Sequence, residues 1–316
     1  MIYYDSHVHT AFSTDSDTPM EQMVKQAIRT GLRGLTFTDH MDYHFPAEYS
    51  FDNSSDCPPF TFDLEKYLTQ ICQMEQTYGA GLQIFRGVEI GLKLDAIEKN
   101  IELSRDKRLD YIIGSIHLVD DMDPYFPQYW EAFGEKKGIA AYFEAALQNV
   151  QHTYAASTCN SINGNNTSDR SRKIEHNNLS SKNSHPDKND SFVRIDTFGH
   201  LDYIVRYAPS GRRFYSYQMY ADVIDEILRI IVKRGISLEV NTSGYKNGGV
   251  MPNPNEDIIR RFRELGGEQI TFGSDAHTAE RMAGRFADAE RIVRKAGFDH
   301  YTTFIGHKPT FHKFDN

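Results

Sequence analysis

Residues 2–40 read IYYDSHVHTAFSTDSDTPMEQMVKQAIRTGLRGLTFTDH, and this stretch predicts a strand, a helix and a second strand. Apolar runs rich in β-branched and aromatic residues predict strands at Ile2–His9 and Gly34–His40. Thr18 precedes an amphipathic pattern that stops at Gly31, where a glycine is typical of a helix end. A helix between two strands predicts that the strands are parallel and joined by a crossover connection.

The start of this first helix has the residues of a capping box. Thr18 is the expected N-cap, Pro19 takes the first helical position, and Glu21 is the expected capping-box partner.

The same alternation continues along the chain. Further strands are predicted at Gln83–Ile90, Asp110–His117, Ile195–Asp202, Ile236–Thr242 and Gln269–Ala276. Further helices are predicted at Asp63–Tyr78, Asp95–Lys107, Lys136–Tyr154, Tyr215–Arg234, Asn255–Leu265 and Ala279–Ala296. Seven strands with intervening helices favour a closed or nearly closed α/β barrel over an open sheet.

One segment interrupts the pattern. Residues 157–191 are rich in Asn and Ser and contain only Ile162, Ile174 and Leu179 as aliphatic residues. Such a composition buries too little apolar surface to offset the loss of chain entropy. We therefore expect one barrel domain over residues 1–316 with a disordered insertion at about 157–191.

Composition excludes several classes of function. The 316 residues carry 35 Lys+Arg and 44 Asp+Glu, a formal charge of -9, which argues against nucleic-acid backbone binding. No apolar run of about 18 residues predicts a membrane span, and the first residues lack the pattern of a signal peptide. The spacings of the three cysteines fit neither a disulfide framework nor a thiolate metal site, so we expect a cytoplasmic protein.

Histidines and carboxylates gather where the predicted strands end. The carboxyl ends of all strands of an α/β barrel converge on one mouth, where active sites lie. The residues at these ends are His7, His9, His40, Glu89, His117, His200, Asp275 and His277. Imidazole and carboxylate ligands without thiolates suit Zn, Mn or Fe. This number of ligands predicts two or three divalent transition-metal ions, an arrangement typical of metal-assisted phosphoryl transfer.

The strand-end motifs resemble the PHP (polymerase and histidinol phosphatase) family over nearly the whole chain. The motifs that carry the resemblance are Asp5–Thr10, Thr38–His40, Gly87–Glu89, Gly114–His117, Gly199–Asp202 and Gly273–His277. The segments Phe12–Pro19 and Leu238–Gly244 resemble its histidinol-phosphatase branch in particular. The resemblance implies a distorted (β/α)7 barrel, similar to a TIM barrel, with a metal cluster at the mouth. It also implies hydrolysis of L-histidinol phosphate within histidine biosynthesis.

Carried over residue by residue, the resemblance implies three metal sites. The first would be held by His7, His9, Glu89 and Asp275. Glu89 would bridge to a second site completed by His117 and His200, and Asp15, His40 and His277 would hold a third.

Other residues are expected to act on the substrate or on the ligands. Arg206 follows the fifth predicted strand and is expected to bind phosphate, so it joins Glu89 and Asp275 as a predicted catalytic residue. Ser243 and Lys246 follow the sixth strand and are candidate phosphate contacts. Asp5 and Asp39 are expected to orient ligand histidines by hydrogen bonds rather than to touch metal.

The expected partner is a small phosphomonoester, with no nucleic acid and no membrane. Two alternatives stay open at this point. The substrate could be a nucleotide, a sugar phosphate or phosphotyrosine, or the chain could be a non-catalytic metal-binding PHP module.

Overall fold

The computed structural model describes residues 1–49, 57–155 and 191–315. The main sheet has seven parallel strands in the order β1-β2-β4-β5-β8-β9-β10, and a short strand β3 pairs with β4 beside them. Their bounds are Tyr4–Val8 (β1), Gly34–Phe37 (β2), His40–Met41 (β3), Gln83–Gly91 (β4), Tyr111–Ser115 (β5), Thr197–Phe198 (β8), Ser237–Asn241 (β9) and Ile270–Gly273 (β10).

The first and last strands of this order meet and nearly close the sheet. The backbone N–H of His9 donates to the carbonyl of Ala276 at 3.0 Å, and that of Asp275 donates to His7 at 2.9 Å. Val8 and Ala276 form an isolated parallel bridge. The predicted seven-stranded α/β barrel, with its distorted (β/α)7 form, is therefore confirmed.

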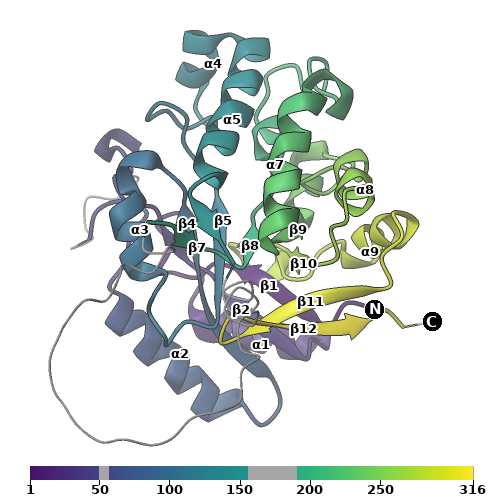
Figure 1. Cartoon of the computed structure of the whole chain (residues 1–316). Helices are drawn as coiled ribbons and strands as arrows, with labels where there is room; N and C mark the ends of the chain where they lie inside the picture. Colours follow the sequence, from purple (N-terminus) through teal and green to yellow (C-terminus); the bar gives the residue numbers. More distant parts are fainter. Residues whose placement is uncertain (50–56, 156–190, 316) are drawn as a thin grey trace, which may run out of the picture.

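Helices surround the strands (Figure 1). They are Met20–Thr30 (α1), Leu64–Tyr78 (α2), Ile97–Leu103 (α3), Pro127–Phe133 (α4), Glu135–Val150 (α5), Ala221–Arg234 (α7), Glu256–Glu264 (α8) and Phe286–Lys295 (α9). The sequence predicts all of these to within a few residues at most ends, except α4, which it does not predict. Helix α9 is shorter than the predicted helix Ala279–Ala296. It begins only at Phe286, because Ala283 and Arg285 have positive φ angles that interrupt a helix.

The capping box predicted at the first helix is wrong. Helix α1 begins at Met20 after Pro19, and no side chain caps it. The Thr18 hydroxyl donates instead to the carbonyl of His277 at 2.9 Å, and Glu21 accepts from the Tyr78 hydroxyl at 2.5 Å. The hydroxyl expected at a helix end thus ties the loop after β1 to the loop after β10.

Six of the seven predicted strands are shorter than expected, and β2 shows how the chain continues beyond such a strand. Strand β2 ends at Phe37, after which Thr38 N–H donates to Val8 on one side. Two residues later His40 pairs with Glu89 of β4 on the other side. Both segments pair with β4 in the same register, Phe37 with Arg86 and His40 with Glu89, so the chain continues along β4 and brings His40 to the mouth of the barrel.

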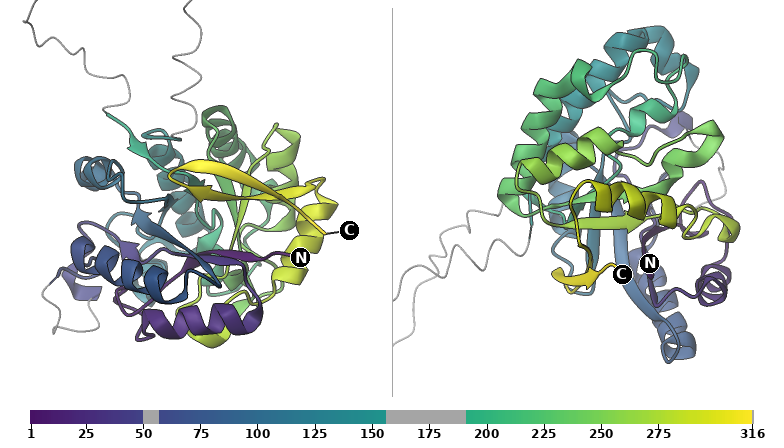
Figure 2. Two further views of the ribbon diagram at one scale, coloured as in Figure 1. Left: turned by 90° about the horizontal axis from the view of Figure 1, so that it is seen from below. Right: turned by 90° about the vertical axis from the view of Figure 1, so that its right-hand side faces the viewer.

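A C-terminal hairpin, which the sequence analysis did not predict, covers the other end of the barrel. Strands β11 (His300–Ile305) and β12 (Lys308–Lys313) are antiparallel, and the hairpin lies across this end in the view from below (Figure 2, left). His307 in its turn is buried, with Nδ1 2.8 Å from Oδ2 of Asp196, the residue before β8. Nothing in the spacing of His307 distinguished it from a solvated histidine.

The two ends of the chain are close together. The N-terminal amine lies 3.2 Å from the Asp315 carboxylate, so the two termini lie side by side (Figures 1 and 2).

Residues 157–190 of the predicted insertion lie outside the described residues. They connect β6 (Thr153–Tyr154) to β7 (Val193–Arg194), which pair in parallel.

Apolar residues from Ile2 to Phe314 contribute to one large buried cluster. Within the part of the chain that the structure describes, no helix has the length and apolar character needed to cross a membrane.

Candidate metal centre

Glu89 of β4 lies at the centre of the histidine cluster. Its Oε2 is 3.1 Å from Nε2 of His7 and 3.4 Å from Nε2 of His9. Its Oε1 is 3.0 Å from Nε2 of His200 and 3.2 Å from Nε2 of His117. Since both oxygens face ring nitrogens, this one carboxylate has the geometry of a bridging ligand.

A second group of candidate ligands lies on the side of β10. Nε2 of His277 is 3.0 Å from Oδ2 of Asp15, and Nε2 of His40 is 3.8 Å from the same oxygen. The His9 ring lies between the two groups, with its centroid 4.2 Å from that of His277 and 4.3 Å from that of His40. Asp275 joins them, since its Oδ1 is 3.6 Å from Nε2 of His9.

Three sets of these residues place ligand atoms within 4.8 Å of one another. They are His7 with His9 and Glu89, His40 with Glu89 and His117, and His9 with His40 and His277. These sets contain six of the nine predicted ligands, and His9, His40 and Glu89 each belong to two of them. His200, Asp15 and Asp275 join the same cluster through the contacts given above.

Hydrogen bonds behind the rings fix which nitrogen carries the proton. Nδ1 of His7 is 2.5 Å from Glu239, and Nδ1 of His117 is 2.6 Å from Asp42. An ionised carboxylate only accepts hydrogen bonds, so each Nδ1 carries a proton, and in the neutral ring, which is the form that binds a metal, each Nε2 presents a lone pair. Nδ1 of His277 likewise faces the carbonyl of Asp275 at 3.1 Å.

The atoms that carry these lone pairs lie close together, and their separations can be compared with those of the ligands around a metal ion. Nε2 of His7 lies 3.0 Å from Nε2 of His9, and both face a Glu89 oxygen. When none of the three groups is protonated, acceptors so close together repel unless a metal cation lies among them. Ligand atoms about 2.1 Å from a tetrahedral zinc ion are about 3.4 Å apart, close to the observed separations. The residues therefore fit a divalent transition metal.

The pKa values of Glu89 and His9 are shifted because the candidate ligands are buried close together. Burial favours the neutral form of Glu89, but the imidazoles of His7 and His117 hold the pKa of its carboxyl well below the usual value. Burial and the neighbouring rings of His277 and His40 hold the pKa of His9 well below its usual value. His9 is therefore a neutral imidazole with a lone pair available to a metal.

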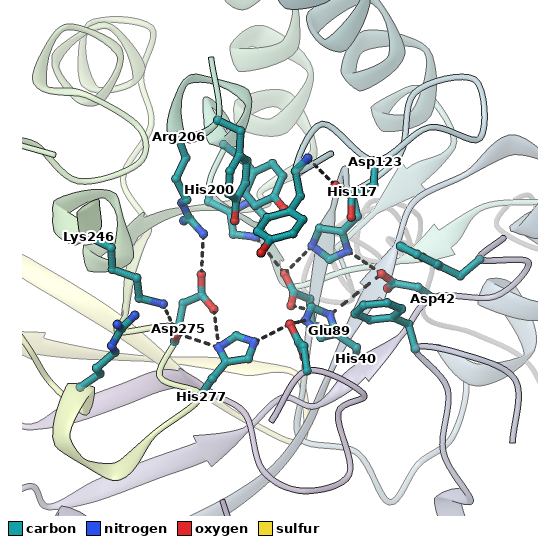
Figure 3. A pocket seen from close by; sticks show the side chains of 17 residues that line it. His40, Asp42, Glu89, His117, Asp123, His200, Arg206, Lys246, Asp275 and His277 are labelled. Carbon is teal, nitrogen blue, oxygen red and sulfur yellow. Dashed lines mark hydrogen bonds and ion pairs between the residues drawn. The ribbon is translucent and has the colours of Figure 1, made fainter. Parts of the chain in front are cut away.

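A cavity of about 300 Å³ opens over this cluster. Figure 3 shows Arg206, Lys246 and Asp275 on one side, Asp42 and Asp123 on the other, and Glu89 between them. Five carboxylates and three cationic side chains line the cavity: Asp15, Asp42, Glu89, Asp123 and Asp275 against Arg206, Lys246 and Arg281. His7 and His9 are fully buried and do not line it. This excess of carboxylates over cationic side chains would repel an anionic substrate unless metal cations were bound.

Comparisons with known proteins agree with this arrangement. A family model described as the PHP domain matches residues 5–243. This chain belongs to the PHP domain family.

Curated relatives of this PHP protein have histidinol-phosphatase names. It is 28% identical to a "Probable histidinol-phosphatase" of Clostridium acetobutylicum, over 92% of each chain. It is 25% identical to the histidinol-phosphatase of Lactococcus lactis, over 96% of this chain and 95% of the relative. A crystal structure of the histidinol phosphate phosphatase of L. lactis, complexed with zinc, L-histidinol and phosphate, superposes with a TM-score of 0.75. That match has 26% sequence identity and covers 98% of both chains.

The predicted phosphate contacts occupy different positions in the PHP barrel. The Arg206 guanidinium lines the cavity and lies 3.3 Å from Oδ2 of Asp275. Lys246 also lines it and donates to the Asp275 carbonyl at 2.9 Å. Ser243 is buried beside Asp275, with its Oγ 2.8 Å from Oδ2, and does not line the cavity. Its hydroxyl supports Arg206 and Asp275 from behind.

Sequence reasoning missed the carboxylates that orient the rings. Asp5 accepts from the backbone N–H groups of Ser274 and Ala283, so it holds a loop rather than a histidine ring. Asp39 acts indirectly, because it accepts from the Ser13 hydroxyl that lies 3.0 Å from Nδ1 of His9. The rings of His7 and His117 contact Glu239 and Asp42 instead. Glu239 could have been singled out in the sequence, because it is a carboxylate inside the predicted buried strand Ile236–Thr242.

Proposed function

We propose that this protein is a metal-dependent histidinol-phosphatase that hydrolyses L-histidinol phosphate to L-histidinol and phosphate. The observation that carries the proposal is the cluster around Glu89, in which imidazole lone pairs and carboxylates converge at the mouth of a PHP barrel. The relatives with histidinol-phosphatase names, matched over most of both chains, support the substrate.

The proposal includes two or three ions of zinc, manganese or iron. His7, His9, Glu89 and Asp275 would hold the first, and Glu89 would bridge to a second held by His117 and His200. Asp15, His40 and His277 would hold the third. When bound, such ions activate a water molecule and neutralise negative charge on the phosphoryl group. The lone pairs and carboxylates described above support these assignments.

The cationic side of the cavity would bind the phosphate. The Arg206 side chain is only 9% exposed and its guanidinium lies over the Tyr203 ring at 4.9 Å, so its direction is fixed before substrate arrives. Two parallel N–H groups of a guanidinium match two phosphate oxygens. Lys246 adds a second positive charge on the same side (Figure 3).

The acidic side would bind the remainder of the substrate. Asp123 is buried in the cavity wall, and its Oδ1 accepts from the backbone N–H of Tyr125 at 2.8 Å. Burial raises the pKa of Asp123 to about 6, so its carboxyl is mostly ionised at neutral pH. A carboxylate opposite the phosphate site favours a substrate with a cationic group, such as the amine of histidinol phosphate, over a sugar phosphate.

A panel of phosphomonoesters tests the substrate. The kcat/KM for histidinol phosphate should exceed that for a nucleotide, a sugar phosphate and phosphotyrosine. Asp123→Asn should raise KM for histidinol phosphate about tenfold, the effect of one charged hydrogen bond, and leave p-nitrophenyl phosphate hydrolysis nearly unchanged. Equal loss for both substrates would contradict the assigned role of Asp123. A higher kcat/KM for another panel member would replace the proposed substrate.

We also propose that the chain forms one PHP barrel domain and works in the cytoplasm. The core cluster that runs from Ile2 to Phe314 supports a single domain. The cysteine spacings, which fit no disulfide framework, support that compartment.

A further inference from the structure

Glu239 of β9 is a buried carboxylate that lies behind two separate metal-ligand segments. Its Oε1 is 2.5 Å from Nδ1 of His7 in β1. Its Oε2 accepts from the backbone N–H of His200, after β8, at 2.7 Å, and from Nδ2 of Asn241 at 3.2 Å. Each oxygen thus holds a different part of the candidate metal centre.

These contacts require a group that only accepts hydrogen bonds. The donors around Glu239 are the Nδ1–H of His7, the backbone N–H of His200 and the side-chain amide of Asn241. A glutamine at this position would turn its NH2 group toward at least one of these donors. If that NH2 faced His7, the ring proton would move to Nε2, the atom that faces Glu89.

The barrel leaves space for this carboxylate at a glycine. Strand β10 lies between β9 and β1, so the Glu239 side chain passes Gly273 to reach His7. A Cβ at Gly273 would lie 2.4 Å from Oε1 of Glu239 and 2.4 Å from Cβ of His7. Gly273 does not have a positive φ angle. A glycine is needed here because a side chain would not fit, and not because the backbone adopts a conformation that only glycine allows.

We propose that Glu239 is a positioning residue that keeps His7 in the metal-binding tautomer and holds the His200 segment in register with it. Glu239 does not contact the metal or the substrate itself. This inference rests on the metal-binding part of the proposed function. Substituting a carboxylate behind a metal-ligating histidine typically weakens metal binding about 10- to 100-fold.

The test is the zinc affinity of Glu239→Gln, measured by competition with a chromophoric chelator in the absence of substrate. We expect binding about 10- to 100-fold weaker than in the wild type. Asp196→Asn is the matched control: Asp196 is 1% exposed and holds His307 and the Ile112 N–H at the far end of the barrel. It should lower the melting temperature of the metal-free protein and leave zinc affinity unchanged.

A second measurement does not depend on the folding of a variant. In the zinc-loaded wild type, long-range ¹H–¹⁵N correlation spectra should show the His7 proton on Nδ1 and none on Nε2. A proton on Nε2 of His7 would overturn the inference whatever the stability of Glu239→Gln.

The outcomes separate this inference from the proposed function. Wild-type zinc affinity in a folded Glu239→Gln variant would overturn the positioning role while leaving the metal centre intact. Weakened binding in Glu239→Gln alone supports the role even if histidinol phosphate proves not to be the substrate. A wild-type protein that binds no zinc, manganese or iron would overturn both.

Discussion

Glu89→Gln should lower kcat/KM for histidinol phosphate by about 10³-fold, because it removes charge stabilisation at the centre of the site. The Glu89 carboxylate lies within 3.4 Å of nitrogens of His7, His9, His117 and His200, and its Oε1 also accepts from the Ser115 hydroxyl at 2.6 Å. An amide nitrogen has no lone pair for a metal, so a glutamine cannot bridge two ions. The number of bound metal ions per chain should fall together with activity.

Steady-state kinetics and elemental mass spectrometry on the same purified sample check this expectation. Asp196→Asn serves as the control for loss of a buried carboxylate away from the mouth, and it should keep wild-type metal content. A Glu89→Gln variant with full metal content and unaltered turnover would show that Glu89 does not bridge the ions.

Arg206→Ala should lower kcat/KM about 10- to 100-fold, the value of one charge-assisted hydrogen bond at about 1.5–3 kcal/mol. The Arg206 guanidinium is held in the cavity wall by Asp275, by the Ser243 hydroxyl and by Asn253. Arg206→Lys should mainly raise KM, because an ammonium cannot make two parallel hydrogen bonds to phosphate. The inhibition constant of inorganic phosphate should rise by a similar factor in Arg206→Ala.

Metal content separates phosphate binding from a structural role for Arg206. Asp275 keeps its contacts to Ser243 at 2.8 Å and to Nδ2 of Asn241 at 3.4 Å when the guanidinium is removed. Arg206→Ala should therefore retain its metal. Arg213→Ala, which removes an exposed arginine over the Phe214 ring, is the matched control and should be kinetically silent. Loss of metal in Arg206→Ala would show that Arg206 holds the Asp275 carboxylate in place rather than binding phosphate.

The barrel could be predicted from the sequence because each β/α unit is a local pattern. A strand run, an amphipathic helix and a glycine at its end recur in order, and crossover connections then require parallel strands. The C-terminal hairpin could not be assigned a place in the same way. Its role depends on the contact between His307 and Asp196, two residues far apart in sequence that only the closed barrel brings together.

The ligands of the site were predictable for a related reason. His7, His40 and Glu89 stand at strand ends, and the ends of parallel strands in a barrel meet at one mouth. The groups behind them depend on which strands are neighbours and on how much space lies between. Glu239 reaches His7 only across Gly273 of the intervening strand, and that proximity has no signature in sequence spacing.

The most direct test of the central claim is phosphate release from L-histidinol phosphate by one protein sample in three states. These states are the protein as purified, after removal of metal by a chelator, and after restoration with zinc, manganese or iron. Elemental mass spectrometry on each state gives the metal content. We expect two or three ions per chain in the active samples, almost no turnover without metal, and recovery on restoration. Full turnover by the metal-free protein, or no hydrolysis of histidinol phosphate by the fully loaded protein, would contradict the central claim.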